Sequence, residues 1–174
     1  MCGIVGIYLK TKKYEKSLGK MLSEMLNNME SRGPDSAGFA IYKDESEKIY
    51  KFSLCINDLD FSSFKKNILK KIKKAKLNQI SDHVILKTTE KPKKVIKIIN
   101  LNYPEISIVG YGRSIEIFKQ VGQPKEVVKK FRLDSFSGTH GIGHTRMATE
   151  SAITTEGSHP YSTGEDECLV HNGS

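Results

Sequence analysis

Residues 1–10, MCGIVGIYLK, decide the fold, because they join a cysteine at the second position to a short apolar run. The apolar run predicts a buried strand over residues 4–9. If Met1 is removed, Cys2 becomes the N-terminal residue, and a small side chain at position 2 permits that removal. Its α-amino group, with an ordinary pKa of roughly 7.7–8.0, can then serve as base for the thiol, whose ordinary pKa is about 8.5. The alternative on this stretch alone is a small residue that merely precedes a core strand.

Length and composition indicate one globular domain with its own core. The chain has 174 residues, of which 37% are hydrophobic and 28% charged, and this length is enough to bury a core. Its apolar stretches are too short to span a bilayer, and lysines follow the first apolar run rather than precede it as in a signal peptide. Three scattered cysteines without a Cys-x-x-Cys pair predict neither a disulfide framework nor a zinc site. We therefore expect a cytoplasmic protein without a bound metal or other cofactor.

The net charge of +8 comes from one segment. Residues 61–100 contain twelve lysines against Asp82 and Glu90, so the rest of the chain is slightly acidic. Within this segment, residues 61–77 predict an amphipathic helix with a lysine-rich face, which is most often a solvated surface. Because aromatic residues that could stack on bases are not interleaved with these lysines, nucleic acid is an unlikely partner.

The glycines predict a frame in two pieces with a different segment between them. Glycine is absent between Phe39 and Val109 and frequent on both sides. We therefore expect a frame over residues 1–52 and 136–174, and an inserted lysine-rich α+β segment over residues 53–135.

Periodicity predicts the elements of the frame and of the insertion. Apolar residues from Leu18 to Met29 recur at helical spacing and predict a helix that stops before Gly33-Pro34. A long loop over 149–166 is more typical of a functional segment than of filler. The remaining pattern predicts a helix over 124–131 and strands over 37–43, 48–53, 83–89, 106–112, 114–122, 140–148 and 167–174.

Residues near the end of the chain can supply what a nucleophilic thiol needs to attack an amide. The tetrahedral intermediate requires hydrogen-bond donors aimed at its oxyanion. Asn172 offers its side-chain NH2, and Gly173 offers a backbone N–H that is open to approach. The alternative is that Asn-Gly simply forms a turn after a strand.

Arginine is rare in this chain, with four arginines among 28 basic residues. We therefore expect the arginines to lie where a planar guanidinium that forms two parallel hydrogen bonds is needed. Arg146 is the natural clamp for a substrate carboxylate, with Thr149 as a second donor. By strand alternation, His144 shares a face with Arg146 and either supports it or merely packs.

Four ordered motifs together resemble the class II glutamine amidotransferases, which are N-terminal nucleophile hydrolases. The motifs are CGIVGI at residues 2–7, SRGPDSAG at 31–38, GHTRMATES at 143–151, and the pair HPYST and LVHNG at 159–173. They cover both ends of the frame, whereas the lysine-rich middle lies outside them.

The resemblance implies a four-layer αββα sandwich of two antiparallel sheets, an α+β fold. It also implies hydrolysis of the side-chain amide of L-glutamine to glutamate and ammonia through a cysteine thioester. By position, Cys2 resembles the nucleophile, Asn172 and Gly173 the oxyanion hole, and Arg146 and Thr149 the binders of the glutamine carboxylate. The motifs further imply supporting roles for the turn at Arg32 and Gly33, which orders the cysteine loop, and for His159.

Among these relatives, the segment over residues 112–131 is similar to the glutaminase component of archaeal-type glutamate synthases. That similarity implies a synthase partner domain or subunit as the ammonia acceptor. A glutaminase of the glucosamine-6-phosphate synthase or amidophosphoribosyltransferase type stays open, as do another N-terminal nucleophile amidase and a catalytically degenerate regulatory or RNA-binding relative. The family's domain continues past the HNG motif with an acidic residue for the substrate's amino group. We therefore expect the chain to be truncated, so that taken alone it could be inactive.

Overall fold

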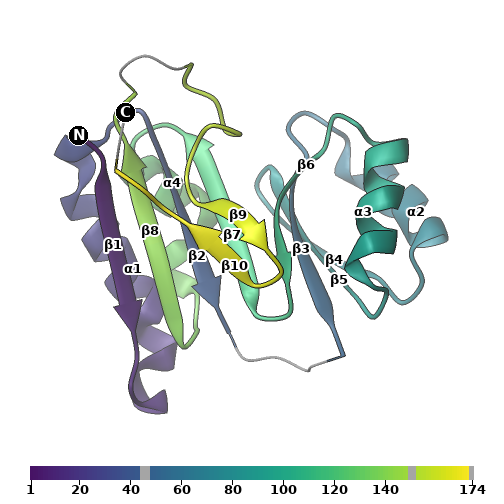
Figure 1. The fold of residues 1–174 in the computed structure, drawn as a ribbon, viewed down its shortest axis with the longest axis horizontal. Coiled ribbons are helices and arrows are strands. Elements are labelled where there is room, and N and C mark those ends of the chain that lie inside the picture. Colours follow the sequence, from purple (N-terminus) through teal and green to yellow (C-terminus); the bar gives the residue numbers. More distant parts are fainter. Residues whose placement is uncertain (44–47, 149–151, 173–174) are drawn as a thin grey trace.

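Two four-stranded antiparallel sheets with helices on their outer sides make up the protein, as seen in a computed structural model that describes residues 1–43, 48–148 and 152–172 (Figure 1). The first sheet has the order β1-β8-β2-β7. Its strands are β1 (Gly3–Tyr8), β8 (His140–Arg146), β2 (Ser36–Tyr42) and β7 (Ile115–Val121). Strand β8 therefore lies between β1 and β2, although it comes from the far end of the chain.

Helix α1 (Leu18–Asn28) covers one face of the first sheet together with α4 (Pro124–Phe131). Three leucines of the predicted stripe, Leu18, Leu22 and Leu26, are buried in the same core cluster as Phe39 of β2 and Phe118 of β7. The short helices η1 (Lys12–Ser17), η2 (Glu30–Arg32) and η3 (Leu133–Ser135) flank these elements. As the helical spacing of its apolar residues predicts, α1 buries one apolar stripe and exposes its other face.

The second sheet has its own core and its own helices. Its order is β4-β5-β3-β6, with β4 (Lys76–Ile80), β5 (His83–Thr88), β3 (Tyr50–Cys55) and β6 (Ser107–Gly112). Helices α2 (Phe61–Lys71) and α3 (Pro92–Asn102) bury Phe64, Ile68, Val95 and Ile99 against it. The Asp60 side chain caps α2 by accepting a hydrogen bond from the Ser63 amide at 2.7 Å. The lysines of α2 remain on its exposed face, as the amphipathic pattern predicts.

The two sheets meet at β6 and β7, which follow each other along the chain. Ser53 on β3 accepts a hydrogen bond from the Ile117 amide of β7 at 2.8 Å. The Asp166 carboxylate accepts hydrogen bonds from the amides of Arg113, Ser114 and Ile115 in the connecting turn. Asp166 itself connects β9 (Tyr161–Gly164) to β10 (Glu167–Leu169), a small ribbon that lies next to β6.

The expectation of an α+β fold with antiparallel sheets is confirmed, while several local predictions were wrong. The helix predicted over 61–77 ends at Lys71, because Ile72 is extended and residues 76–80 pair with β5 as strand β4. Helix α3 was not anticipated. The loop expected over 149–166 contains β9, and the strand expected over 167–174 is described only over the three residues of β10.

The division into a frame over residues 1–52 and 136–174 and an insertion over residues 53–135 remains an expectation. In the structure, β7 and α4 fall within 53–135 but belong with the first sheet. Strand β7 pairs with β2 along its whole length, and α4 packs on that sheet. The residues from β3 to β6 form the second sheet with α2 and α3. None of the helices in the described ranges is long and apolar enough to cross a membrane.

Replacing Leu22 with alanine tests the core under α1. Leu22 is fully buried, so the variant should lose about 2–5 kcal/mol of unfolding free energy through lost burial and the resulting cavity. Leu101→Ala is the matched control, because Leu101 also lies in a helix but is 71% exposed, and its change should stay within about 0.5 kcal/mol. Urea denaturation measures both, and equal losses would contradict this assignment of the core.

Candidate functional site

The ends of the chain meet at Cys2. The Cys2 backbone nitrogen donates a hydrogen bond to Oδ1 of Asn172 at 3.3 Å, across a separation of 170 residues. Cys2 is half-buried and its thiol is free. Oδ1 of Asn172 is thereby occupied as an acceptor, and both N–H donors of the amide, on Nδ2, take no part in this bond.

Met1 contacts Met147 and Arg32, of which Arg32 is a predicted site residue. Its terminal nitrogen is 3.1 Å from Sδ of Met147, and Nη2 of Arg32 is 3.8 Å from Sδ of Met1. Met1 is 73% exposed. Arg32 therefore lies beside residue 1.

The motif at residues 31–38 holds the end of β8. A side chain at Gly33 would collide with the backbone of Thr145 and Arg146, so the turn can approach the strand only with glycine at that position. Asp35 bonds the residues on either side of Met147: its amide donates to the Arg146 carbonyl at 3.1 Å, and its carboxylate accepts from the Ala148 amide at 2.8 Å. The turn and the strand end thus form one backbone unit.

Arg146 is the last residue of β8 and is 91% buried. Strand pairing puts Gly3 opposite Thr145, so Cys2 and Arg146 occupy the next register position of neighbouring strands. One guanidinium nitrogen, Nη1, donates to the Ala152 carbonyl at 3.3 Å. The arginine thus lies at the same end of the first sheet as Cys2 and contacts the loop that follows β8.

Two of the predicted site residues, Thr149 and Gly173, lie outside the described residues. Of the other predicted residues, Cys2, Asn172, Arg32, Gly33 and Arg146 gather at one end of β1 and β8. The roles assigned to these residues from the sequence stay predictions.

His159 belongs to a packed group of rings on the inner side of this end of the sheet. Its ring centroid lies 4.1 Å from that of His144, 4.6 Å from that of His171 and 4.2 Å from that of Tyr161. His144 is fully buried and its Nε2 bonds the His171 carbonyl at 3.0 Å. His159 therefore packs between the strand and the segment that leads to Asn172.

Burial keeps these imidazoles neutral. Desolvation lowers the pKa of His144 to about 4, and the neighbouring charges of His171 and Arg146 act in the same direction. Desolvation also lowers the pKa of His159 to about 3, assisted by His144, His171, Lys119 and Arg146. Both rings are consequently uncharged near neutral pH.

Sequence reasoning missed Lys119, which anchors the loop carrying His159. Its Nζ is buried and donates to the Ser158 carbonyl at 2.8 Å and to the Glu156 carbonyl at 3.1 Å. Burial lowers its pKa to about 8. The signal was present, because strand alternation puts Lys119 on the same face of β7 as the buried Ile115 and Ile117.

One group of side chains among the described residues has the composition of a metal site. The ligand atoms of Cys55, Asp82 and His83 lie within 4.8 Å of one another. Each is already engaged within the protein: Asp82 accepts from Lys130 at 3.0 Å and contacts His83 at 3.1 Å, and the Cys55 thiol bonds Asn57. The ammonium at this position disfavours a cation, so we assign no metal there.

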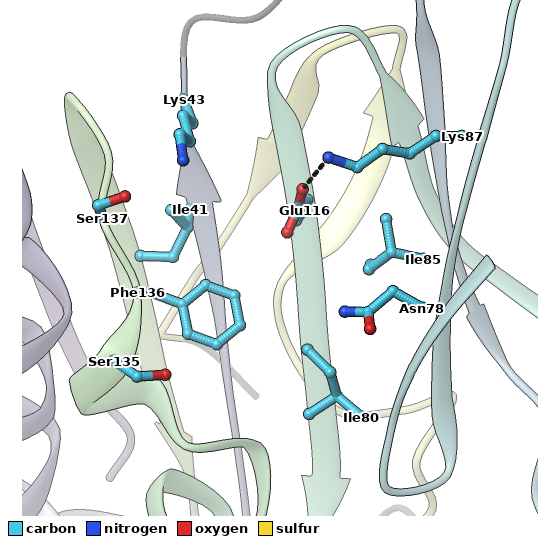
Figure 2. A pocket seen from close by; sticks show the side chains of 10 residues that line it. All are labelled: Ile41, Lys43, Asn78, Ile80, Ile85, Lys87, Glu116, Ser135, Phe136 and Ser137. Atoms are coloured by element: carbon cyan, nitrogen blue, oxygen red, sulfur yellow. Dashed lines mark ion pairs between the residues drawn. The ribbon is translucent and has the colours of Figure 1, made fainter. Parts of the chain in front are cut away.

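A pocket of about 420 Å³ lies where the two sheets face each other (Figure 2). Apolar side chains line its middle, and Glu116 and Lys87 form an ion pair at 3.8 Å on one side. Its described lining residues do not include Cys2, Arg146 or Asn172, so the pocket is not part of the candidate site.

An antiparallel α+β domain with a cysteine at position 2, an asparagine amide beside it and a buried arginine at the adjacent strand end fits the class II glutamine amidotransferases. Relatives by sequence support that class. The "Glutamine amidotransferase-like protein GlxB" of Rhizobium meliloti (strain 1021) is 45% identical over 177 aligned positions, covering 100% of this chain and 59% of the relative. A "Putative glutamine amidotransferase" of Methanothermobacter thermautotrophicus is 31% identical over 188 positions, covering 99% of this chain and 61% of the relative.

A shorter similarity points to the same class. It is to a glutamine–fructose-6-phosphate aminotransferase (isomerizing) of Methanococcus maripaludis, with 38% identity over 72 positions that cover 41% of this chain and 12% of the relative. The chain spans about 60% of the length of the first two relatives named above. No protein-family model matches the chain.

The neutral histidines predict a loss of stability in mild acid. The unfolded chain takes up protons on these histidines near a pKa of 6.5, whereas folded His144 and His159 do so only near about 4 and about 3. Unfolding therefore binds protons below about pH 6.5, and the free energy of unfolding should fall as the pH is lowered from about 7 to about 5. Urea denaturation across this range measures the slope.

His159→Phe is the variant that isolates this effect, because it keeps a buried ring and removes one titrating group. Its unfolding free energy should depend less steeply on pH than that of the unchanged protein. The same slope in both proteins would mean that His159 is not buried as a neutral ring.

Proposed function

We propose that the chain is a glutaminase domain that hydrolyses the side-chain amide of L-glutamine through a thioester on Cys2 and passes ammonia to a synthase partner. The observation that carries this proposal is the hydrogen bond between the Cys2 nitrogen and Oδ1 of Asn172. It joins the nitrogen that would become the catalytic base to the side chain that would stabilise the oxyanion. The named relatives support a glutaminase domain of this kind.

The first half of the reaction uses Cys2 as both base and nucleophile. After removal of Met1, the neutral α-amine accepts the thiol proton as sulfur attacks the amide carbon. Nδ2 of Asn172, with the backbone N–H of Gly173, would donate to the oxyanion of the tetrahedral intermediate. Collapse of the intermediate forms the thioester, and the proton held by the amine leaves with the nitrogen as ammonia.

The second half hydrolyses the thioester. The α-amine, neutral again, accepts a proton from water as the water oxygen attacks the thioester carbonyl. The same donors would stabilise the second oxyanion. Collapse releases glutamate, and the proton returns to the thiolate.

Arg146 supplies the binding energy for the substrate carboxylate in this proposal. Its burial makes a charge-assisted hydrogen bond stronger than it would be in water, and its planar fork suits a carboxylate. Thr149 would add a second donor. Arg32 and Gly33 would support the site as the turn that orders the cysteine loop. Gly33 packs against the backbone of Thr145 and Arg146, and Arg32 lies beside Met1, the residue next to Cys2.

The glutamate synthase type of acceptor is the finer part of the proposal. It is supported by the resemblance of residues 112–131, whereas the names of the relatives designate no such acceptor. The arrangement of both sheets as an αββα N-terminal nucleophile sandwich belongs to the same proposal. Acceptors of the glucosamine-6-phosphate synthase or amidophosphoribosyltransferase type would use the same chemistry at Cys2 and differ in the partner.

Cys2→Ala should abolish glutamine hydrolysis, with a loss of more than about a thousandfold in kcat, because the nucleophile is removed. Intact-protein mass spectrometry after treatment with a glutamine-analogue chloroketone measures the same site directly. The unchanged protein should lack Met1 and carry one adduct on Cys2.

Cys168→Ala is the matched control, since Cys168 is also a half-buried free cysteine but lies on β10. It should keep both the adduct and the activity. A retained Met1 without an adduct would contradict the proposed function.

Arg146→Lys should raise the KM for glutamine by about 10- to 100-fold while changing kcat less, because lysine keeps the charge but loses the bidentate fork. Steady-state ammonia release measures both constants. Arg132→Lys is the control, since Arg132 is an exposed arginine next to α4 and should leave KM unchanged. A fall in kcat at constant KM would place Arg146 in the chemical step instead of in carboxylate binding.

A further inference from the structure

A buried side chain of the first sheet bonds the segment that carries Asn172. His144 lies on β8, opposite Ile4 of β1 on one side and Gly38 of β2 on the other. Its Nε2 is 3.0 Å from the carbonyl oxygen of His171, the residue immediately before Asn172. His144 thus bonds the peptide unit from which the Asn172 side chain extends.

Hydrogen-bond chemistry assigns the proton on this imidazole. A backbone carbonyl can only accept, so Nε2 of His144 must carry the hydrogen. Nδ1 of the same ring is buried without a hydrogen-bond partner in the described residues. Of the two neutral tautomers, the Nε2–H form therefore satisfies the carbonyl, and it leaves Nδ1 as an acceptor without a donor in the described residues.

Ring packing limits where the His171 peptide can lie. His159 contacts both His144 and His171, with ring centroids 4.1 Å and 4.6 Å away. Tyr161 closes the other side of His159 at 4.2 Å. The segment before Asn172 is therefore held by the ring contact between His159 and His171 and by the hydrogen bond from His144 to the His171 carbonyl.

We propose that His144 is a positioning residue for Asn172: its Nε2–H holds the His171 carbonyl and so sets the Asn172 amide beside Cys2. This inference rests on the proposed function, because the position of Asn172 matters through the oxyanion. His144 touches neither the substrate nor the thiol in this account. A neutral donor suits the task, since a second positive charge beside Arg146 would be repelled.

The test compares two substitutions at one position. His144→Phe keeps a buried ring and removes the donor, leaving the His171 carbonyl unpaired, so kcat should fall about 10- to 100-fold with little change in KM. His144→Gln places an amide donor near the position of Nε2 and should recover most of the lost kcat. His140→Phe, on the same strand, is the control and should keep full activity.

A double variant asks whether His144 acts through Asn172. Asn172→Ala alone should lower kcat, and adding His144→Phe should lower it little further, because the side chain that His144 positions is already gone. Independent losses that multiply would overturn the proposal. So would equal losses in His144→Gln and His144→Phe, or no loss in either.

Alkylation separates this proposal from a general structural effect. Iodoacetamide reacts with a thiolate without forming an oxyanion, so His144→Phe should be alkylated at Cys2 at the rate of the unchanged protein. A parallel loss of alkylation and hydrolysis would mean that the substitution disturbs Cys2 itself, and would overturn the positioning role.

Nuclear magnetic resonance tests the assignment without a variant. The ring nitrogen shifts of His144 near neutral pH should report the Nε2–H tautomer, and an Nδ1–H tautomer or a charged ring would overturn the proposal. This result does not depend on turnover. An unchanged protein that shows the expected tautomer but no Cys2-dependent hydrolysis would instead contradict the proposed function.

Discussion

The position of β8 between β1 and β2 is the constraint on which the site depends. Hydrogen bonding on both edges fixes the register of β8, with Gly3 opposite Thr145 and Ser36 opposite Arg146. A shift by one residue would turn every side chain of β8 to the other face. Because β8 carries both His144 and Arg146, this register determines what lies beside the cysteine that precedes β1.

Close backbone approach then holds the end of that strand. Gly33 touches the backbone of β8 where a side chain would not fit, and Asp35 bonds the residues on both sides of Met147. These contacts explain why the SRGPDSAG motif belongs to the site although it offers no nucleophile. The turn limits the freedom of the backbone at Arg146, and under the proposed function an arginine positioned in this way would bind a carboxylate at a smaller entropic cost.

Two buried polar side chains, Lys119 and His144, form hydrogen bonds with loops at the same end of the sheet. Lys119 donates to two carbonyls of the loop before β9, and His144 donates to the carbonyl of His171. Burial lowers the pKa of both side chains, so the histidine is neutral at ordinary pH. Loops that lack regular structure are thereby held by side-chain donors from strands, which have well-defined positions.

The sequence alone determined the features that depend on local spacing. The stripe from Leu18 to Met29 predicted α1, Pro124 and the following residues predicted α4, and the order of four motifs indicated the class and the candidate site. Tertiary structure decided the rest. Residues 76–80 form β4 because pairing with β5 outweighs their continuation of a lysine-rich helix, and Lys119 is buried because β7 joins the first sheet. The contact between Cys2 and Asn172 spans almost the whole chain. It forms where β8 pairs with β1 and where His144 of β8 bonds the His171 carbonyl, an arrangement that no local pattern specifies.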